Sequence, residues 1–397
     1  MKHYVFLRIL RKNCGWGGFE KQLLDYFERV DYSKTRVTFV TNFDIHSGRI
    51  RQKGLPVEVK LFPLINPEKS YMPFWERYRF LASLKPDCVV MAQGAFTDFI
   101  LSDFLAGFLV SRGRLYSLEA LGAPEPPERN SKKHFGVFPG IGLWWTKHMV
   151  SCRLKGWLCR YNICIGNDVR DRLVRWYGYP KGKTVTVYHG VDVKKYHPDV
   201  LIKEQMRKKW GVGISDKIII STARLSVEKC VDRLIQAFGN LNSSIPTWLF
   251  IVGEGPLREK LESLARQTKS ADRVKFLGFQ EDIPALLKMS DIFALPSDIE
   301  GLSNAMMEAM AVGLVAVVTD APGAREVIED QINGFVVEKS PESVSAGLQK
   351  ALSLSSPEVQ RISIQTQERI QQKFNIEAGT REGLLVLGIP HIPVSVN

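Results

Sequence analysis

The stretch DIFALPSDIEGLSNAMMEAMAVGLVAVVTD (residues 291–320) has the pattern of a strand, a helix and a second strand. Residues 291–297 and 313–320 are short apolar runs typical of buried strands, and residues 303–313 between them have a helical composition. Ser303 can cap that helix, because its side-chain oxygen can accept a hydrogen bond from a free backbone N–H. Two buried strands joined by a helix favour an α/β fold with a parallel sheet.

The same alternation continues along the chain on both sides of this stretch, and a connector rich in Gly, Pro and Asp interrupts it at residues 189–199. We therefore predict an α/β protein with two Rossmann-like, doubly wound parallel-sheet domains, 1–187 and 188–375, facing a central cleft. Ligands of such sheets bind at the carboxyl ends of the strands. The further strands are expected at 3–10, 36–42, 87–93, 114–120, 161–167, 217–223, 247–253, 274–279 and 334–338, and the further helices at 19–30, 168–178, 231–240, 256–267 and 283–290.

The composition is that of a folded soluble protein, with 45% hydrophobic and 24% charged residues in a chain of 397, a length that suits two domains. No apolar run approaches the ~18 residues of a membrane-spanning helix. The first residues lack a small-residue cleavage site, so we interpret them as a strand and not as a signal peptide. The six cysteines are scattered without metal-ligand spacing, which indicates reduced thiols and a cytoplasmic location.

The positive charge is concentrated in the first half of the chain. Residues 1–200 carry 32 Lys and Arg against 18 Asp and Glu, a net charge of +14, whereas the remainder carries 22 against 24. This asymmetry suggests an anionic partner, such as the inner face of a plasma membrane, a lipid phosphate or nucleic acid, although a solvated basic surface would look the same. No nucleic-acid-binding module is recognisable, so we expect no nucleic acid partner.

Residues 121–147 break the alternation, because they are rich first in Pro and Gly and then in basic and aromatic residues. We expect a long loop or cap there. Lys132, Lys133, Trp144, Trp145 and Lys147 could form a lip that faces a membrane or an acceptor. The alternative is an irregular loop with its tryptophans tucked into the core.

Two glutamates in the opening stretch are candidates for ligand binding. Glu300 falls in the loop at a strand end, and Glu308 falls among apolar residues of the following helix, where a carboxylate is costly without a partner. The helix start also offers free N–H groups and a positive dipole end that suit a phosphate. A nucleotide sugar would satisfy these three features. The alternative is that Glu308 lies on the solvent side of the helix.

Two further loops could hold a phosphate. Arg224 and Lys229 lie between a strand and a helix, where two cations can neutralise a diphosphate without a metal, or can simply be surface cations. Gly17 and Gly18 lie in the first strand-to-helix turn, where glycine lets the backbone approach a ligand. The stretch IVGEGPLRE (251–259) lacks the full dinucleotide-binding pattern, and we interpret it as a structural turn.

Taken together, these motifs resemble those of the retaining glycosyltransferases of family 4 (glycosyl transferases group 1), which have the GT-B fold. The matching stretches include YHGVDVKKYHP, ARLSVEKCVDRLIQAF, IVGEGPLREKL, VKFLGF, DIFALPSDIEGLSNAMMEAMAVG and TDAPGAREVIEDQINGFVV, and they cover roughly residues 186–340. The first half resembles the family more loosely, through GGFEKQLLDYF and RYNICIGNDVRDRL. The resemblance implies that a sugar is transferred, with its anomeric configuration retained, from a nucleoside-diphosphate donor to a hydroxyl of a glycan, glycolipid or lipid-linked acceptor.

The resemblance also implies roles for single residues. Glu300 would bond the donor sugar, and Glu308 the ribose. Arg224 and Lys229 would bind the diphosphate. The amides of Gly301, Leu302 and Ser303 would face the sugar or phosphate, and Gly17 and Gly18 would close on the donor from the first domain. The C-terminal segment 376–397 would pack back on the first domain.

The chain departs from the family at one position. Members usually have a histidine at a strand end of the first domain, whereas Glu119 holds about that place here, with no histidine within ten residues. Either Glu119 takes the contact, or His134 or His148 reaches in, or turnover is poor.

The resemblance implies no cofactor and no required metal, with UDP as the first candidate donor nucleotide and GDP as the second. Envelope polysaccharide or glycolipid assembly is the expected setting. The alternatives are a catalytically weak nucleotide-sugar-binding partner protein and, within enzymes of this fold, an epimerase or a phosphorylase.

Overall fold

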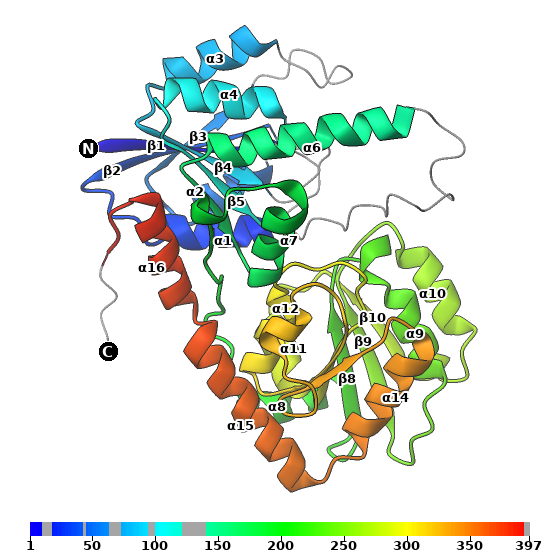
Figure 1. Ribbon diagram of the computed structural model, residues 1–397. Coiled ribbons are helices and arrows are strands. Elements are labelled where there is room, and N and C mark those ends of the chain that lie inside the picture. Colours follow the sequence, from blue (N-terminus) through cyan, green and yellow to red (C-terminus); the bar gives the residue numbers. More distant parts are fainter. Residues whose placement is uncertain (10–17, 43–44, 63–72, 94–99, 121–139, 393–397) are drawn as a thin grey trace. The chain divides into compact units, whose positions relative to one another are not determined.

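The computed structural model describes residues 1–9, 18–42, 45–62, 73–93, 100–120 and 140–392 (Figure 1). The chain divides into two compact units: unit 1 is Met1–His189 with Glu377–Asn397, and unit 2 is Gly190–Ile376. The expected boundary at residue 187 lies two residues before the division that the structure shows. Each unit is built on one parallel sheet with helices on both faces.

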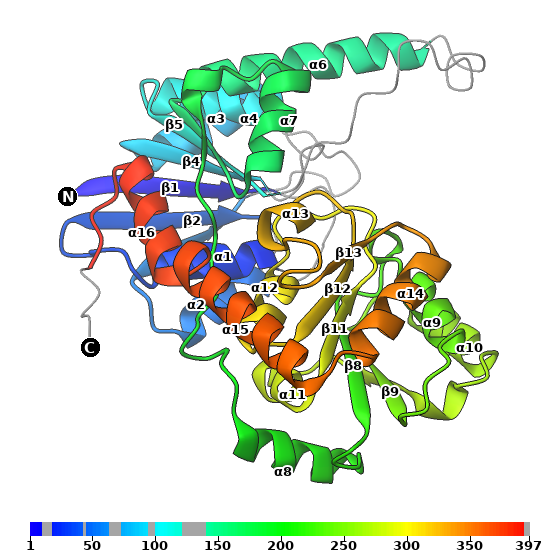
Figure 2. The same cartoon turned by 60° about the horizontal axis from the view of Figure 1, so that its bottom comes forward.

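Unit 1 has a seven-stranded sheet in the order β3-β2-β1-β4-β5-β6-β7. Helices α1, α2 and α16 lie on one side of this sheet, and α3, α4 and α6 lie side by side on the other (Figures 1 and 2). The strands are β1 (Lys2–Arg8), β2 (Thr35–Thr41), β3 (Val57–Leu61), β4 (Cys88–Gln93), β5 (Leu115–Glu119), β6 (Tyr161–Cys164) and β7 (Thr184–Thr186). The helices are α1 (Gly18–Phe27), α2 (Ile45–Gln52), α3 (Phe74–Ser83), α4 (Leu101–Val110), α6 (Gly140–Leu158), α7 (Asn167–Tyr177) and the final helix α16 (Ile376–Leu387).

Helix α16 completes the core of unit 1 although it comes last in the sequence. Leu384 and Leu387 share a buried cluster with Tyr4 and Phe6 of β1, because alternate residues of a strand point to one face of the sheet. The Tyr4 hydroxyl donates a 2.5 Å hydrogen bond to the carbonyl of Gly388. The end of the chain is thereby fixed to the first strand.

Unit 2 has a six-stranded sheet in the order β10-β9-β8-β11-β12-β13. The strand order reverses between β8 and β11, and ligands of open α/β sheets bind at the carboxyl ends of strands at such a reversal. The strands are β8 (Lys217–Thr222), β9 (Thr247–Val252), β10 (Val274–Gly278), β11 (Ile292–Leu295), β12 (Val315–Thr319) and β13 (Phe335–Val337). The helices are α8 (Val200–Trp210), α9 (Val231–Gly239), α10 (Arg258–Arg266), α11 (Ile283–Met289), α12 (Asn304–Ala311), α13 (Ala324–Val327), α14 (Pro341–Leu352) and α15 (Ser356–Lys373).

The fold class predicted from the sequence is confirmed, with two α/β units on parallel sheets. The interpretation of residues 121–147 as a loop is wrong from residue 140 onward, because α6 begins there. The proline-rich texture ends at Pro139, and nothing in the next nineteen residues breaks a helix. Lys132 and Lys133 lie outside the described residues, as do the side chains of Trp144, Trp145 and Lys147.

The five cysteines that the structure describes, Cys88, Cys152, Cys159, Cys164 and Cys230, are buried free thiols. Among the described residues, no helix combines the length and the apolar character needed to cross a bilayer.

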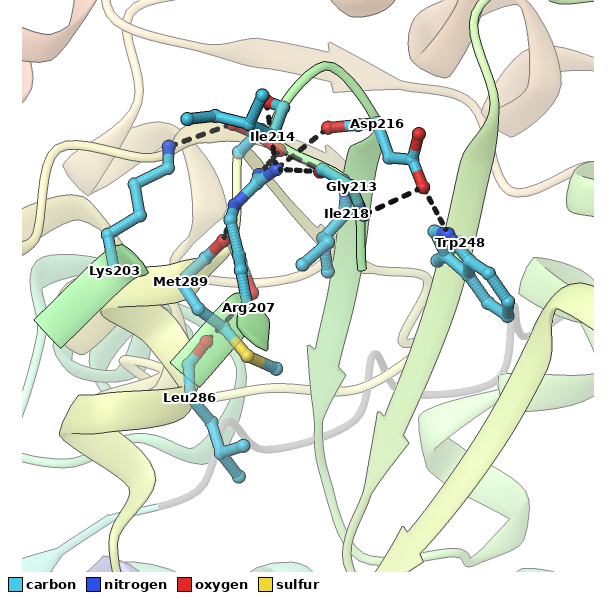
Figure 3. A network of polar contacts seen from close by, with 11 residues as sticks. Lys203, Arg207, Gly213, Ile214, Asp216, Ile218, Trp248, Leu286 and Met289 are labelled. Atoms are coloured by element: carbon cyan, nitrogen blue, oxygen red, sulfur yellow. Dashed lines mark hydrogen bonds and ion pairs between the residues drawn. The ribbon is translucent and has the colours of Figure 1, made fainter. Parts of the chain in front are cut away.

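A polar network anchors α8 to the amino-terminal edge of the sheet of unit 2 (Figure 3). The buried Arg207 donates to the carbonyls of Met289, Gly213 and Asp216 at 2.9–3.0 Å. Its other terminal nitrogen lies 2.5 Å from the carboxylate of Asp291, which also accepts from the partly exposed Lys203 at 3.0 Å. Arg207 therefore satisfies several buried acceptors at once, whereas Lys203 adds a contact at the rim.

This difference predicts unequal effects of two substitutions on the same carboxylate. Arg207→Met should lower the free energy of unfolding by about 3–5 kcal/mol, because it leaves buried acceptors without a donor. Lys203→Met should cost less than about 1 kcal/mol, as is usual for an exposed pair. Urea unfolding followed by fluorescence and circular dichroism measures both, and equal losses would contradict the assigned difference.

Candidate active site

The residues of the opening motif surround a small pocket at the carboxyl ends of β11 and β12. It is lined by Ser297, Glu300, Gly301 and Ser303 from the loop after β11, and by Thr319 and Ala321 at the end of β12. Ser303 caps α12, accepting from the N–H of Met306 at 3.4 Å, so the predicted cap is confirmed. The N-terminus of α12, with its free N–H groups and positive dipole end, therefore opens toward this pocket.

Glu300 and Lys229 form an ion pair across the strand reversal. The Lys229 Nζ lies 2.7 Å from Glu300 Oε1, and the two side chains are 22% and 10% exposed. Lys229 follows β8 and Glu300 follows β11, the two strands between which the order of the sheet reverses. The structure thus brings together two residues that lie 71 positions apart and that the sequence assigned to the same site.

Contacts between the two loops hold this pair in place. The N–H of Asp298 donates to the carbonyl of Glu228 at 2.9 Å. Arg233, in the first turn of α9, donates to the carbonyl of Pro296 at 2.6 Å and to the Asp298 carboxylate at 2.9 Å. Burial opposes ionisation of Asp298, but its hydrogen bonds with Cys230 and Arg233 outweigh burial and lower its pKa. Asp298 therefore serves as a charged anchor for the loop that carries Glu300.

Arg224 lies on the loop after β8, supported by the glycine turn at 251–259. A Cβ on Gly253, whose φ is +132°, would overlap the carbonyl oxygen of Ala223, and one on Gly255 would overlap that of Leu225. The N–H of Leu225 also donates to the carbonyl of Glu254 at 2.9 Å. These contacts agree with the interpretation of this turn as structural, and they position the backbone on either side of Arg224.

A second glycine fixes the loop that carries Glu300. Gly323 has a φ of +79°, and a Cβ there would overlap the carbonyl oxygen of Gly301. The backbone after β12 therefore packs directly on the peptide between Gly301 and Leu302. This contact restricts the orientation of that peptide and therefore the direction of the Leu302 N–H.

Glu308 is buried at 8% exposure, so the alternative that it lies on the solvent side of α12 is wrong. It is hydrogen bonded to Tyr196, which is 4% exposed and lies in the connector at 189–199. Burial and the neighbouring carboxylate raise the pKa of the Tyr196 hydroxyl, which consequently stays protonated and donates to Glu308. Sequence reasoning missed Tyr196, because its spacing within the connector marks no element.

Glu119 occupies a different environment, in the interior of unit 1. It ends β5 with 2% of its side chain exposed, and the Nζ of the fully buried Lys155 lies 2.8 Å from Oε1 and 3.0 Å from Oε2. The rings of Phe104 and Tyr179 flank Lys155 at 5.1 and 5.9 Å. A contact between Glu119 and a donor sugar would require this ion pair to open.

The structure describes only some of the remaining candidate site residues. Gly17 and His134 lie outside the described residues, Gly18 is the first residue of α1, and His148 is half-buried in α6. Glu20, two residues after Gly18, is buried in an ion pair with Arg8 at 2.7 Å.

The chemistry that this arrangement allows is anion binding next to a hydroxyl-binding carboxylate. Arg224, Lys229 and the N-terminus of α12 present positive charge or dipole at one sheet edge, and Glu300 can accept from hydroxyls there. Within the described residues, no group of three or more His, Cys, Asp or Glu side chains is arranged to hold a metal ion.

Comparison with known sequences finds a family match in the second half of the chain. Residues 180–369 match the model of the family described as Glycosyl transferases group 1. The chain is 32% identical over 186 residues to the putative glycosyltransferase EpsD of Bacillus subtilis, a match that covers 46% of this chain and 49% of that protein. It is 33% identical over 194 residues to a GDP-mannose-dependent phosphatidylinositol monomannoside mannosyltransferase of Mycolicibacterium smegmatis, covering 44% and 50%. The chain thus spans about half the length of the curated relatives it matches.

Comparison with solved structures extends the likeness of fold to the whole chain. The Anabaena protein Alr3699/HepE in complex with UDP and glucose superposes with a TM-score of 0.75 at 20% identity, over 98% of this chain and 100% of that one. The lipopolysaccharide-biosynthesis glycosyltransferase WaaG gives 0.73 at 16% identity, over 97% and 100%. These likenesses show the GT-B fold.

The contact between Gly323 and Gly301 predicts a large effect of one methyl group. Gly323→Ala should lower the free energy of unfolding by roughly 2–5 kcal/mol, since overlap with backbone adds to the cost of a positive φ. Gly211→Ala is the matched control, because Gly211 has a φ of +67° with no neighbouring atom within 4 Å. It should cost only the backbone term, about 1–2 kcal/mol. Similar values for the two variants would argue against the close packing of these loops.

The ion pair of Glu119 and Lys155 predicts that substituting Lys155 restores stability lost by substituting Glu119. Glu119→Gln should destabilise the protein by about 3–5 kcal/mol, because it leaves the Lys155 ammonium buried without a counter-charge. Adding Lys155→Met should restore most of that loss, since a buried pair can be replaced by apolar side chains of similar volume. Thermal unfolding of the single and double variants checks this, and a double variant no more stable than the single would disprove the pairing.

Proposed function

We propose that the protein is a retaining glycosyltransferase of family 4. It would move a sugar from a nucleoside-diphosphate donor to a hydroxyl of a glycan, glycolipid or lipid-linked acceptor. The observation that carries the proposal is the Lys229–Glu300 pair at the strand reversal, beside the N-terminus of α12. The proposal is supported by the match of residues 180–369 to glycosyl transferases group 1 and by relatives whose names specify sugar transfer.

In the proposed reaction, the donor diphosphate binds to Arg224, Lys229 and the N-terminus of α12. The bond between the anomeric carbon and the diphosphate breaks through an oxocarbenium-like transition state. Negative charge then grows on the leaving oxygen, and preorganised cations and N–H groups stabilise it without a protein nucleophile. The acceptor hydroxyl supplies the new bond, and its proton passes to the leaving phosphate.

Glu300 and Glu308 are assigned to opposite ends of the donor. Glu300 accepts from hydroxyls of the sugar, while Lys229 holds its carboxylate in place. Glu308 accepts from the ribose and is oriented from the other side by Tyr196. The amides of Gly301, Leu302 and Ser303 face the sugar or phosphate. The assignment of Gly17 and Gly18 to the donor stays a prediction from the family resemblance.

We propose UDP as the donor nucleotide and GDP as the alternative. The Anabaena protein is in complex with UDP, and GDP-mannose is named for the mycobacterial relatives. Both diphosphates would make the same contacts with Arg224 and Lys229, so the choice between them lies with the base. We propose metal-independent transfer on the cytoplasmic side of the membrane, in envelope polysaccharide or glycolipid assembly.

A second candidate function is a catalytically weak nucleotide-sugar-binding partner protein. The burial of Glu119 against Lys155 favours it, because a carboxylate engaged in a buried ion pair is not available for the contact that the histidine of family members would make. Such a protein would bind one nucleotide sugar without releasing the nucleoside diphosphate.

Release of nucleoside diphosphate from a panel of UDP-, GDP-, ADP- and dTDP-sugars tests the proposal. We expect turnover of one donor, with Glu300→Gln lowering kcat by roughly 10–100-fold, the loss of a hydrogen bond to a charged group. Glu308→Gln should instead raise the donor KM by about tenfold, because the ribose contact is made equally in the ground and transition states.

Glu262→Gln on α10 is the control, since Glu262 pairs with Arg258 of its own helix and takes no part in the candidate site. It should retain the wild-type rate. Thermal stabilisation by one nucleotide without release from any donor would favour the second candidate function. A protein that shows neither release nor stabilisation with any of these nucleotides would refute the donor site.

A further inference from the structure

Helices α3, α4 and α6 of unit 1 each bury a charged side chain among apolar ones. Each turns a charged residue inward: Arg77 is 2%, Asp103 3% and Lys155 0% exposed. Arg77 and Asp103 pair with each other between α3 and α4, and Lys155 pairs with Glu119 of β5. The usual arrangement of a water-facing helix places apolar residues inward and charges outward.

The outer side of the same helices carries large apolar side chains. They recur at helical spacing, so each set forms a stripe along its helix. On α4 these are Leu105 (39% exposed) and Leu109 (52%), and on α6 Val150 (52%), Leu154 (49%) and Trp157 (61%). Trp157 also packs against the ammonium of Lys183.

The three helices present these stripes on one surface. Figures 1 and 2 both show α3, α4 and α6 side by side on one face of the sheet. The buried Arg77–Asp103 pair joins α3 to α4, and α4 in turn contacts α6. Trp75 of α3, 66% exposed, extends the set to a third helix. We call this surface the α3/α4/α6 face.

Charge on the α3/α4/α6 face has one sign. The described parts of these helices contain two acidic residues, Glu76 and Asp103, and neither is exposed. The exposed charged residues on the helices or within two residues after them are cations, namely Arg79, Lys85, Arg112, Arg153 and Arg160. Exposed apolar side chains among cations, without exposed carboxylates, are what a surface needs to lie in the headgroup region of an anionic bilayer.

We propose that the α3/α4/α6 face docks unit 1 on a membrane of anionic lipids. The leucine, valine and tryptophan side chains enter the boundary between headgroups and acyl chains, and the arginines contact lipid phosphates. A protein partner would need acidic groups on a complementary surface, whereas a bilayer supplies both the apolar phase and the negative charge. This docking is separate from the donor site and does not depend on glycosyl transfer.

Flotation with vesicles of phosphatidylglycerol and phosphatidylcholine, without any sugar nucleotide, tests the proposal. We expect the full chain to bind these vesicles and not vesicles of phosphatidylcholine alone, with binding that weakens as salt is raised. Leu154→Glu should weaken binding by roughly tenfold, because it replaces an inserted apolar group by a charge that the lipids repel. Arg153→Gln should weaken it by about fivefold.

Leu385→Glu is the matched control. Leu385 is 61% exposed on α16, on the opposite side of the same sheet, so this variant should bind like the wild type. Equal loss in Leu385→Glu and Leu154→Glu would overturn the assigned face. Absence of binding by the wild type, or equal binding to neutral vesicles, would overturn the docking itself.

Two further measurements distinguish membrane docking from unfolding and from self-association. Circular dichroism and the melting temperature show whether each variant is folded, and Arg153→Gln adds no carboxylate that could disturb the helix. Sedimentation of the wild type and Leu154→Glu tests association between copies of the chain. A dimer that dissociates in Leu154→Glu, without vesicle binding by the wild type, would assign the face to self-association and reject the lipid surface.

Discussion

The ion pair between Lys229 and Glu300 depends on one constraint, the reversal of strand order between β8 and β11. At any other place in an open parallel sheet, a helix connection covers the carboxyl end of the neighbouring strand; at the reversal, two loops diverge and leave side chains accessible. Contacts next to the pair hold these two loops in place. Asp298 and Arg233 join them, and the glycine turn after β9 supports the first.

That arrangement requires close backbone packing that only glycine allows. Gly253 and Gly323 both have positive φ, and both lie where a side chain would overlap a carbonyl oxygen of a site loop. The site is therefore set by backbone as much as by charged side chains. The apolar strands of unit 2 supply a rigid frame on which such contacts can be precise.

How much the sequence could predict follows from the range of the interactions involved. The alternation of buried strands and amphipathic helices predicts the two sheets, and Ser303 predicts the start of α12, because both signals are local. Contacts between residues far apart in the sequence leave no such local signal. Nothing local shows that Tyr196 reaches Glu308, or that Lys155 neutralises Glu119. The strand Thr184–Thr186 is too short to show a period, and the proline-rich residues before α6 masked the start of that helix.

The discontinuous make-up of unit 1 has a consequence for synthesis on the ribosome. Unit 2 is one continuous segment, so all its strands emerge together and it can fold as soon as residue 376 is free. Unit 1 emerges first, yet its core lacks Leu384 and Leu387 until the last helix appears, and Tyr4 bonds a carbonyl that lies 384 residues further along the chain. The half made first is thus the half completed last. During the translation of unit 2, the apolar strands of unit 1 therefore remain partly exposed. A chaperone that acts in this period would bind the side of β1 that α16 later covers.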